Sequence, residues 1–256
     1  MTTYRPACQT ITWGDDQDKD FPGVFREIAA AGFSGVEIGF RRLESTPPET
    51  LKKILNDHGL LLIGSHIGGN LADLNQARGE WDVLTRVLDY LNTLDAKLLM
   101  LSGIHGKDAN SLQHELDFFE KSAAVCETHG VSLLYHNHDW EFTSPQGIWE
   151  AMLKRKAFRF CPDVGWIYKG GRPVLDTLHQ IKHRIGAIHF KDFEAMEPRM
   201  NPTTLGDGAA PLTEAAEWIK GHLSEPCWIV AEQDQTDIPT PDMARRNGAF
   251  LKNVLT

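Results

Sequence analysis

One unit recurs along the whole chain: a stretch with helical periodicity, a turn, and then a short apolar run that ends in polar side chains or glycine. The joins between helical stretch and apolar run fall at residues 29–40, 55–69, 94–106, 128–139, 155–166, 182–192 and 224–234. With the opening run at 7–14, they predict eight strands. Near-continuous apolar strands that alternate with helices are typical of parallel pairing, with both faces of the sheet covered.

Eight such units favour the α/β class and a closed (β/α)8 TIM barrel, with residues 1–256 forming a single domain. A chain of 256 residues with 41% hydrophobic content can bury one core of this size. An open doubly wound sheet is the competing architecture, but no GxGxxG follows any of the apolar runs. The irregular stretch at 193–212 is expected to be a loop over the barrel mouth.

Composition excludes several classes of function. The formal net charge of -9 and the lack of a Lys/Arg block argue against nucleic acid as a partner. The four cysteines, Cys8, Cys126, Cys161 and Cys227, form no CxxC pair, so neither a zinc ribbon nor a disulfide framework is expected. No apolar run approaches the roughly 20 residues that span a bilayer. We therefore expect a cytoplasmic protein with no membrane partner.

Polar residues finish the apolar runs. In a barrel of parallel strands, all carboxyl ends of the strands meet at one mouth. The strand-end residues are Trp13, Glu37, His66, His105, His136, His138, Glu141, Asp163, His189, Lys191, Glu232 and Asp234. Any one of them has an ordinary structural explanation, such as helix capping for Asp163, but so many ionisable groups together predict a reaction site.

Four of these side chains suit a metal ion. Glu232 follows a mostly apolar run, where a carboxylate is costly unless a cation compensates it. His189 and Lys191 are two residues apart, which in a strand places them on one face. Together Glu141, Asp163, His189 and Glu232 would supply three carboxylates and one imidazole, a set that suits Mn²⁺, Mg²⁺, Co²⁺ or Zn²⁺.

Several motifs resemble the xylose isomerase-like barrel superfamily of sugar phosphate isomerases and epimerases, in particular its subgroup with an HNHxxEF sequence. The matching motifs, in order, are YHNHDWEF (135–142), PDVGWIYKGG (162–171), IHFKDF (188–193), LGDG (205–208) and VAEQD (230–234). The resemblance implies one divalent metal ion at the barrel mouth, with Mn²⁺ the most frequent choice.

The resemblance also implies which residues bind that ion. The metal-binding aspartate, histidine and last-strand glutamate of the family match Asp163, His189 and Glu232. The fifth strand lacks the internal glutamate of many epimerases, so the first ligand is expected to be Glu141, with His136 or His138 as its substitute.

A metal that holds a carbonyl and an adjacent hydroxyl lowers the pKa of the intervening carbon acid and stabilises the enediolate. The sequence therefore predicts an enzyme that enolises a ketose or a 3-keto sugar or glycoside. If Glu141 and Glu232 exchange protons on opposite faces of the carbon, the outcome is epimerisation or isomerisation.

A second outcome stays open. If His136, His138 or His66 is the base and Lys191 holds the developing oxyanion, a leaving group beta to the carbanion is expelled. The protein would then be a lyase or dehydratase, and the fifth strand without a glutamate favours this reading slightly.

The substrate is expected to be a small unphosphorylated sugar or keto-sugar, because cations near the strand ends are few: Arg41, Arg42, Lys169 and Lys191. The residues expected to contact it are Trp13, Glu37, His66, His105 and Trp166. A metal-free sugar-binding barrel and, less favoured, an endonuclease IV-like phosphoesterase are the alternatives. Pairing of outer helices into a homodimer is also left open.

Overall fold

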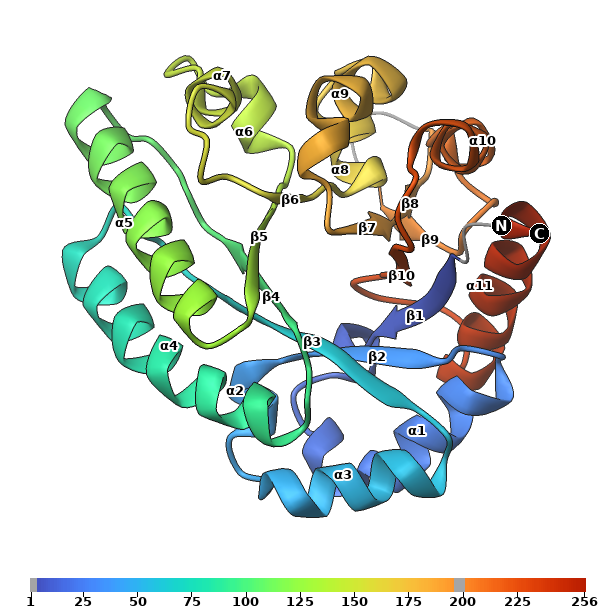
Figure 1. Cartoon of the computed structure of the whole chain (residues 1–256). Coiled ribbons are helices and arrows are strands. Elements are labelled where there is room, and N and C mark those ends of the chain that lie inside the picture. Colours follow the sequence, from blue (N-terminus) through green and yellow to red (C-terminus); the bar gives the residue numbers. More distant parts are fainter. Residues whose placement is uncertain (1–3, 196–200) are drawn as a thin grey trace.

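Figure 1 shows a computed structural model of the chain, in which residues 4–195 and 201–256 are described. Eight parallel strands form a nearly closed barrel in the order β6-β5-β4-β3-β2-β1-β10-β7. Their bounds are β1 Arg5–Gln9, β2 Gly35–Gly39, β3 Leu61–Gly68, β4 Leu98–Ser102, β5 Ser132–His136, β6 Phe160–Cys161, β7 Ala187–Phe190 and β10 Trp228–Ala231. The predicted (β/α)8 architecture is confirmed.

Helices surround the barrel (Figure 1). Their bounds are α1 Phe21–Ala30, α2 Phe40–Leu43, α3 Pro48–Asp57, α4 Leu74–Thr93, α5 Ala109–Thr128, α6 Trp140–Thr143, α7 Ile148–Leu153, α8 Val164–Lys169, α9 Val174–Ile181, α10 Leu212–His222 and α11 Thr240–Leu255. Short 3-10 helices cover Ile11–Trp13, Gln17–Asp20 and Lys182–Arg184. The two longest helices begin at aspartate caps, since Asp73 and Asp108 accept hydrogen bonds from the first-turn backbone.

The seam between β6 and β7 is the weakest part of the barrel wall. Isolated bridges link Phe160 to Ile185 and Asp163 to His189. The backbone N–H of His189 donates to Pro162 O at 2.9 Å. Asp163 and His189 therefore face each other across the place where the barrel closes.

Alternation along the strands separates an inner layer from an outer one. Met100, Leu134, Cys161 and Ala187 form a small buried cluster, distinct from the large core that packs the strands against the helices. Because side chains alternate between the faces of a strand, a residue two positions further on points the same way. The next inner positions after Leu134, Cys161 and Ala187 are polar, and they reach the carboxyl ends of the strands.

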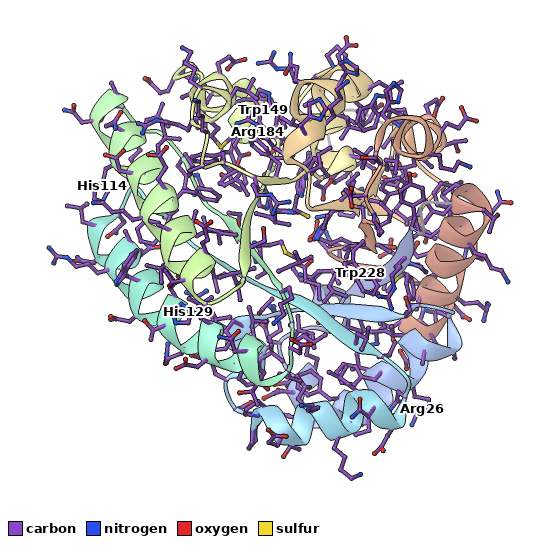
Figure 2. The ribbon with its side chains drawn as sticks, viewed as in Figure 1. Arg26, His114, His129, Trp149, Arg184 and Trp228 are labelled. Carbon is purple, nitrogen blue, oxygen red and sulfur yellow. The ribbon has the colours of Figure 1, made fainter. Side chains whose placement is uncertain are left out.

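Some polar side chains on the outer helices are exposed to solvent. Arg26, His114 and His129, on α1 and α5 and at the end of α5, are exposed (Figure 2). Trp149, on α7, is fully buried. His114 and His129 are thus separate from the histidines at the barrel mouth.

The stretch predicted as a loop at 193–212 holds a small hairpin. Strands β8 (Asp192–Phe193) and β9 (Pro202–Thr203) pair antiparallel. Residues 196–200 of the predicted loop lie outside the described residues.

The buried carboxylate of Asp192 anchors the segment that follows β9. Its oxygens accept from the backbone N–H groups of Phe193, Gly206, Gly208 and Ala210, at 2.9 to 3.0 Å. The LGDG segment is thereby fixed against the end of β7, next to Lys191.

Candidate active site

Four side chains from four strands converge at the barrel mouth. His136 ends β5, Asp163 follows β6, His189 lies in β7 and Glu232 follows β10. One ligand atom from each lies within 4.8 Å of the others, and all four residues are buried. Three of the four expected metal ligands lie in this group, and His136, the substitute considered for the first ligand, takes the place of Glu141.

Two carboxylates hold the imidazole of His189. Its Nε2 lies 2.7 Å from Glu37 Oε2, and its Nδ1 lies 2.5 Å from Glu232 Oε2. Burial alone would lower the pKa of His189, but the contact with Cys161 and the charges of Glu37 and Glu232 outweigh it and raise the pKa well above the usual value. Glu37, which was expected to contact substrate, is fully buried and lies within hydrogen-bond distance of this histidine.

Lys191 is a buried cation beside the group. Its Nζ donates to Asp234 at 2.9 and 3.0 Å and to Glu232 at 3.1 Å, and lies 4.7 Å from the ring centroid of Trp166. Burial raises the pKa of Glu232, but Lys191 and His189 more than reverse this and hold it well below the usual value. Glu232 is therefore ionised at neutral pH.

Asp163 both caps a helix and faces the mouth. Its Oδ1 accepts from the backbone N–H of Trp166 at 2.8 Å, which begins α8. Its Oδ2 is buried without a hydrogen-bond partner and lies 3.9 Å from Lys191 Nζ. Burial raises the pKa of this carboxyl to about 7, although Lys191 opposes the shift.

These residues fit a divalent ion. A buried carboxylate oxygen without a hydrogen-bond partner is costly unless a cation contacts it. Asp163 Oδ2 and Glu37 Oε1 are both such atoms among the described residues. The donor set of two imidazoles and two carboxylates is richer in nitrogen than the sequence predicted, so it suits Mn²⁺, Co²⁺ or Zn²⁺ better than Mg²⁺, which prefers oxygen.

The structure does not bring Glu141 into this group. Its Oε1 accepts from the Tyr135 hydroxyl at 2.6 Å and its Oε2 from the backbone N–H of His138 at 2.8 Å. The short helix α6 turns the carboxylate back towards the outer side of β5, where burial raises its pKa to about 8. Glu141 therefore holds the turn after β5, and the prediction that it joins the other three ligands does not match this geometry.

His138 lies within a set of stacked rings. Its ring stacks on Trp140 with centroids 4.1 Å apart and lies 5.2 Å from Trp166. Burial, with a smaller contribution from Lys191, lowers the pKa of His138 to about 3, so the imidazole is neutral. Within the described residues, His138 Nδ1 and Trp166 Nε1 are buried and lack hydrogen-bond partners.

The other predicted contact residues have varied surroundings. His66 Nε2 pairs with Ser102 Oγ at 3.0 Å, and its ring lies 5.7 Å from that of His136. The ring of His105 stacks on Trp140 at 5.0 Å. The indole N–H of Trp13 donates to Glu27 on α1 at 2.7 Å, so this tryptophan packs against the helix layer.

Sequence reasoning missed Asn137. Its amide brackets the backbone of Asp163, accepting from the N–H at 3.1 Å and donating to the carbonyl at 3.4 Å. An asparagine between two strand-end histidines was a usable signal, because its side chain can pair with both backbone groups of a neighbouring strand. Tyr135 was missed because its position reads as ordinary core.

A nearly closed parallel barrel with buried imidazoles and carboxylates at its carboxyl-terminal mouth defines a class of barrels with a candidate metal site. The chain belongs to the xylose isomerase-like TIM barrel family, whose model matches residues 25–254. A search of curated proteins finds none that matches. No helix in the described parts of the chain combines the length and apolar character needed to cross a membrane.

Solved structures share the fold at low identity. A sugar phosphate isomerase/epimerase from Parabacteroides distasonis is 18% identical with a TM-score of 0.78, over 98% of this chain and 94% of that one. A probable 3-DHS dehydratase of petrobactin synthesis from Bacillus anthracis is 14% identical with a TM-score of 0.78, over 97% and 99%. A D-psicose 3-epimerase from Clostridium cellulolyticum, with D-tagatose, is 15% identical with a TM-score of 0.75, over 98% and 99%.

Proposed function

We propose that the protein is a divalent-metal-dependent enzyme that removes the proton next to a carbonyl group of a ketose or a 3-keto sugar or glycoside. The observation that carries this proposal is the convergence of His136, Asp163, His189 and Glu232 beside Lys191 at the strand ends. The epimerases and the dehydratase that share the fold support it, since both kinds of enzyme are built on this barrel.

The ligands we propose are the four converging side chains: His136, Asp163, His189 and Glu232. A divalent ion bound there acts as a Lewis acid towards a carbonyl and its neighbouring hydroxyl, which makes the adjacent carbon acidic. Glu37 accepts from the second nitrogen of His189 and so orients that ligand.

The remaining residues supply the proton acceptor and the oxyanion contact. His138 Nδ1, which lies among the stacked rings without a hydrogen-bond partner in the described residues, is the atom placed to accept a proton from the substrate carbon. Lys191 Nζ, a buried cation, stabilises negative charge that develops on a substrate oxygen. The indole N–H of Trp166, free of any partner in the described residues, donates to a sugar hydroxyl.

We favour elimination over epimerisation as the outcome. Inversion at one carbon needs two proton-exchanging groups on opposite faces, and Glu141 was the expected partner of Glu232. Glu141 instead faces Tyr135 and the backbone of His138. A single base with Lys191 beside the oxyanion fits a lyase or dehydratase, in which the electron pair left by the proton expels a beta leaving group.

The substrate we propose is unphosphorylated. Each cation near the strand ends already has partners. Arg41 contacts Gly68 O and Glu80, and Arg42 contacts Asp15. Lys169 lies over the rings of Trp166 and Phe193. A phosphate would have to displace these contacts.

Solvent exchange tests the proposal. Incubation with Mn²⁺ and a panel of 3-keto glucosides and simple ketoses in deuterium oxide is expected to release an aglycone or water. Deuterium entry without release would indicate the epimerase instead. His189→Ala should abolish both events, while His114→Ala, an exposed histidine on α5, should leave them unchanged. If metal is bound and no substrate of the panel shows either release or deuterium entry, the result would contradict enolisation.

A metal-free sugar-binding barrel is the second candidate, because Lys191 already compensates part of the acidic charge. Elemental analysis of the purified protein distinguishes the metal-dependent enzyme from the binding protein. Stoichiometric metal in the wild type, together with its loss in Asp163→Asn, supports the enzyme. Sugar binding by protein that contains no metal supports the binding protein.

A further inference from the structure

Cys161 adds a thiol to the floor of the site. It is fully buried in β6, in register with His136 of β5, and belongs to the inner layer with Met100, Leu134 and Ala187. Asp163 follows two residues later. The thiol therefore lies on the inward face of its strand, one step deeper in the barrel than the carboxylate of Asp163.

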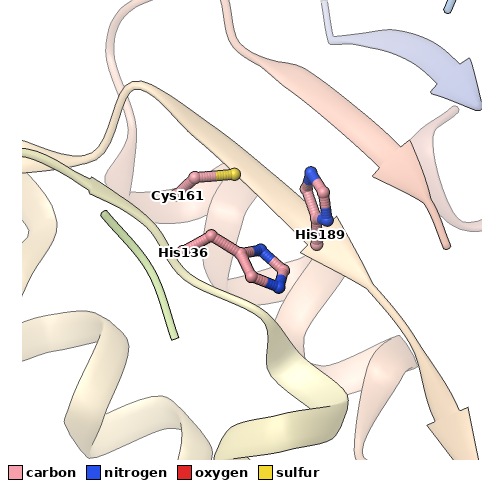
Figure 3. Close-up of side chains that lie close together, drawn as sticks. All are labelled: His136, Cys161 and His189. Atoms are coloured by element: carbon pink, nitrogen blue, oxygen red, sulfur yellow. The ribbon is translucent and has the colours of Figure 1, made fainter. Parts of the chain in front are cut away.

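Cys161 forms a second donor group with two of the histidines. Its Sγ, one ring nitrogen of His136 and one of His189 all lie within 4.8 Å of one another. Figure 3 shows the sulfur directed towards the ring of His189, with the ring of His136 beside it. The three residues are buried, and His136 Nδ1 has no hydrogen-bond partner within the described structure. A small apolar filler, the ordinary role of a buried cysteine, does not require two imidazoles at its sulfur.

A divalent ion that coordinates the Cys161 thiol deprotonates it outright, and the proton passes to solvent.

We propose that His136, Cys161 and His189 form an alternative metal position that selects a thiophilic divalent ion such as Zn²⁺ or Co²⁺. Two imidazoles and a thiolate are a donor set typical of tetrahedral zinc, with a fourth place left for a carboxylate or water. This position shares both histidines with the site of the proposed function, on which the inference rests to that extent. A thiophilic ion bound there excludes Mn²⁺ from the position that uses Asp163.

Cobalt alone is the probe. Protein stripped with a chelator is titrated with Co²⁺ while visible and near-ultraviolet absorption are recorded. The expected result is a near-ultraviolet thiolate-to-cobalt band that saturates at one ion per chain. Cys161→Ser should lose this band and keep the weaker visible bands of cobalt held by the histidines and carboxylates. Cys126→Ser, which removes a buried thiol on α5, should keep both.

The affinities for Zn²⁺ and Mn²⁺, measured in competition, test the inference independently. Zn²⁺ affinity in Cys161→Ser should fall by at least the roughly 10–100-fold that follows loss of an outer-shell partner. Mn²⁺ affinity should change little. If Cys161→Ser does not fold, Cys161→Ala replaces it. The cobalt spectrum of the wild type tests the thiolate ligand without any variant.

Each other outcome overturns the inference. Visible cobalt bands without a near-ultraviolet band in the wild type would exclude the thiol and leave the proposed function standing. A band that persists in both Cys161 variants would assign it to another cysteine. Failure of the stripped protein to bind any divalent ion would overturn this position together with the metal in the proposed function.

Discussion

At the scale of single residues, burial and hydrogen bonding oppose each other at Glu141. Both carboxylate oxygens accept hydrogen bonds, from the Tyr135 hydroxyl and from the backbone of His138. Burial nevertheless raises the pKa of this group from 4.5 to about 8. The carboxyl that holds the turn after β5 is therefore one whose charge changes across the ordinary working range of pH.

Replacement of Glu141 by glutamine should flatten the pH dependence of stability. Because the folded pKa lies above the unfolded one, the contribution of the protonated group is complete below about pH 4.5 and is lost as the pH rises to about 8. Urea unfolding at several pH values should show the wild type losing up to ~1.4 kcal/mol per pH unit relative to Glu141→Gln. The exposed-site control Glu127→Gln should follow the wild type, and parallel curves for Glu141→Gln would refute the assignment.

At the scale of elements, the join between β6 and α8 decides where Asp163 points. A side-chain Cβ at Gly165 would lie 2.4 Å from the backbone oxygen of Lys191. The first turn of α8 therefore packs directly on the chain that leaves β7, which brings the two sides of the barrel seam together. Only glycine allows this approach.

Gly165→Ala should push α8 away from Lys191. We expect a loss of roughly 1–3 kcal/mol in the free energy of unfolding, as for overpacked sites, and weaker metal binding through displaced Asp163. Gly79→Ala is the matched control. Gly79 is exposed on α4 with nothing near its Cβ position, so the alanine should stabilise the protein by up to about 1 kcal/mol. Equal effects of the two changes in urea unfolding would refute the packing argument.

The carboxylate of Asp192 should stabilise the segment that follows β9. Asp192→Ala leaves four backbone N–H groups without their acceptor, and we expect a cost of about 2–4 kcal/mol in unfolding free energy. Asp207→Ala removes only a surface ion pair with Arg246 and should cost under about 1 kcal/mol. Limited proteolysis should cut between 193 and 212 faster in Asp192→Ala alone, and unchanged cleavage would count against the anchor.

Sequence patterns predicted elements better than side-chain directions. Apolar runs located the eight strands of the barrel, because alternation with helices leaves few other arrangements, but they did not predict the short hairpin of β8 and β9. They also brought Asp163, His189 and Glu232 to one mouth. They did not distinguish Glu141 from His136, since that depends on how α6 turns after β5 and on the Tyr135 hydroxyl that receives the carboxylate. Local periodicity in the sequence does not predict the contacts that side chains make across the barrel.

At the scale of the whole molecule, the four converging side chains come from strands on both sides of the β6–β7 seam. His136 and Asp163 lie on one side, and His189 and Glu232 on the other. Isolated bridges, rather than a continuous ladder, join the wall at that place. An ion held by all four would therefore link the two edges of the barrel.

Metal binding should accordingly raise the thermal stability of the chain. At a free Mn²⁺ concentration of 100 times Kd, linkage adds about 2.7 kcal/mol to the free energy of unfolding, provided that the unfolded chain does not bind the ion. For a chain of this size, that corresponds to a rise in Tm of roughly 5–10 °C. Asp163→Asn removes one proposed ligand and should lose most of the rise, while His114→Ala, on the outer helix α5, should keep it in full. A Tm that no divalent ion raises in the wild type would mean that nothing bridges the seam, and the four side chains would then be held by Lys191 and their own hydrogen bonds alone.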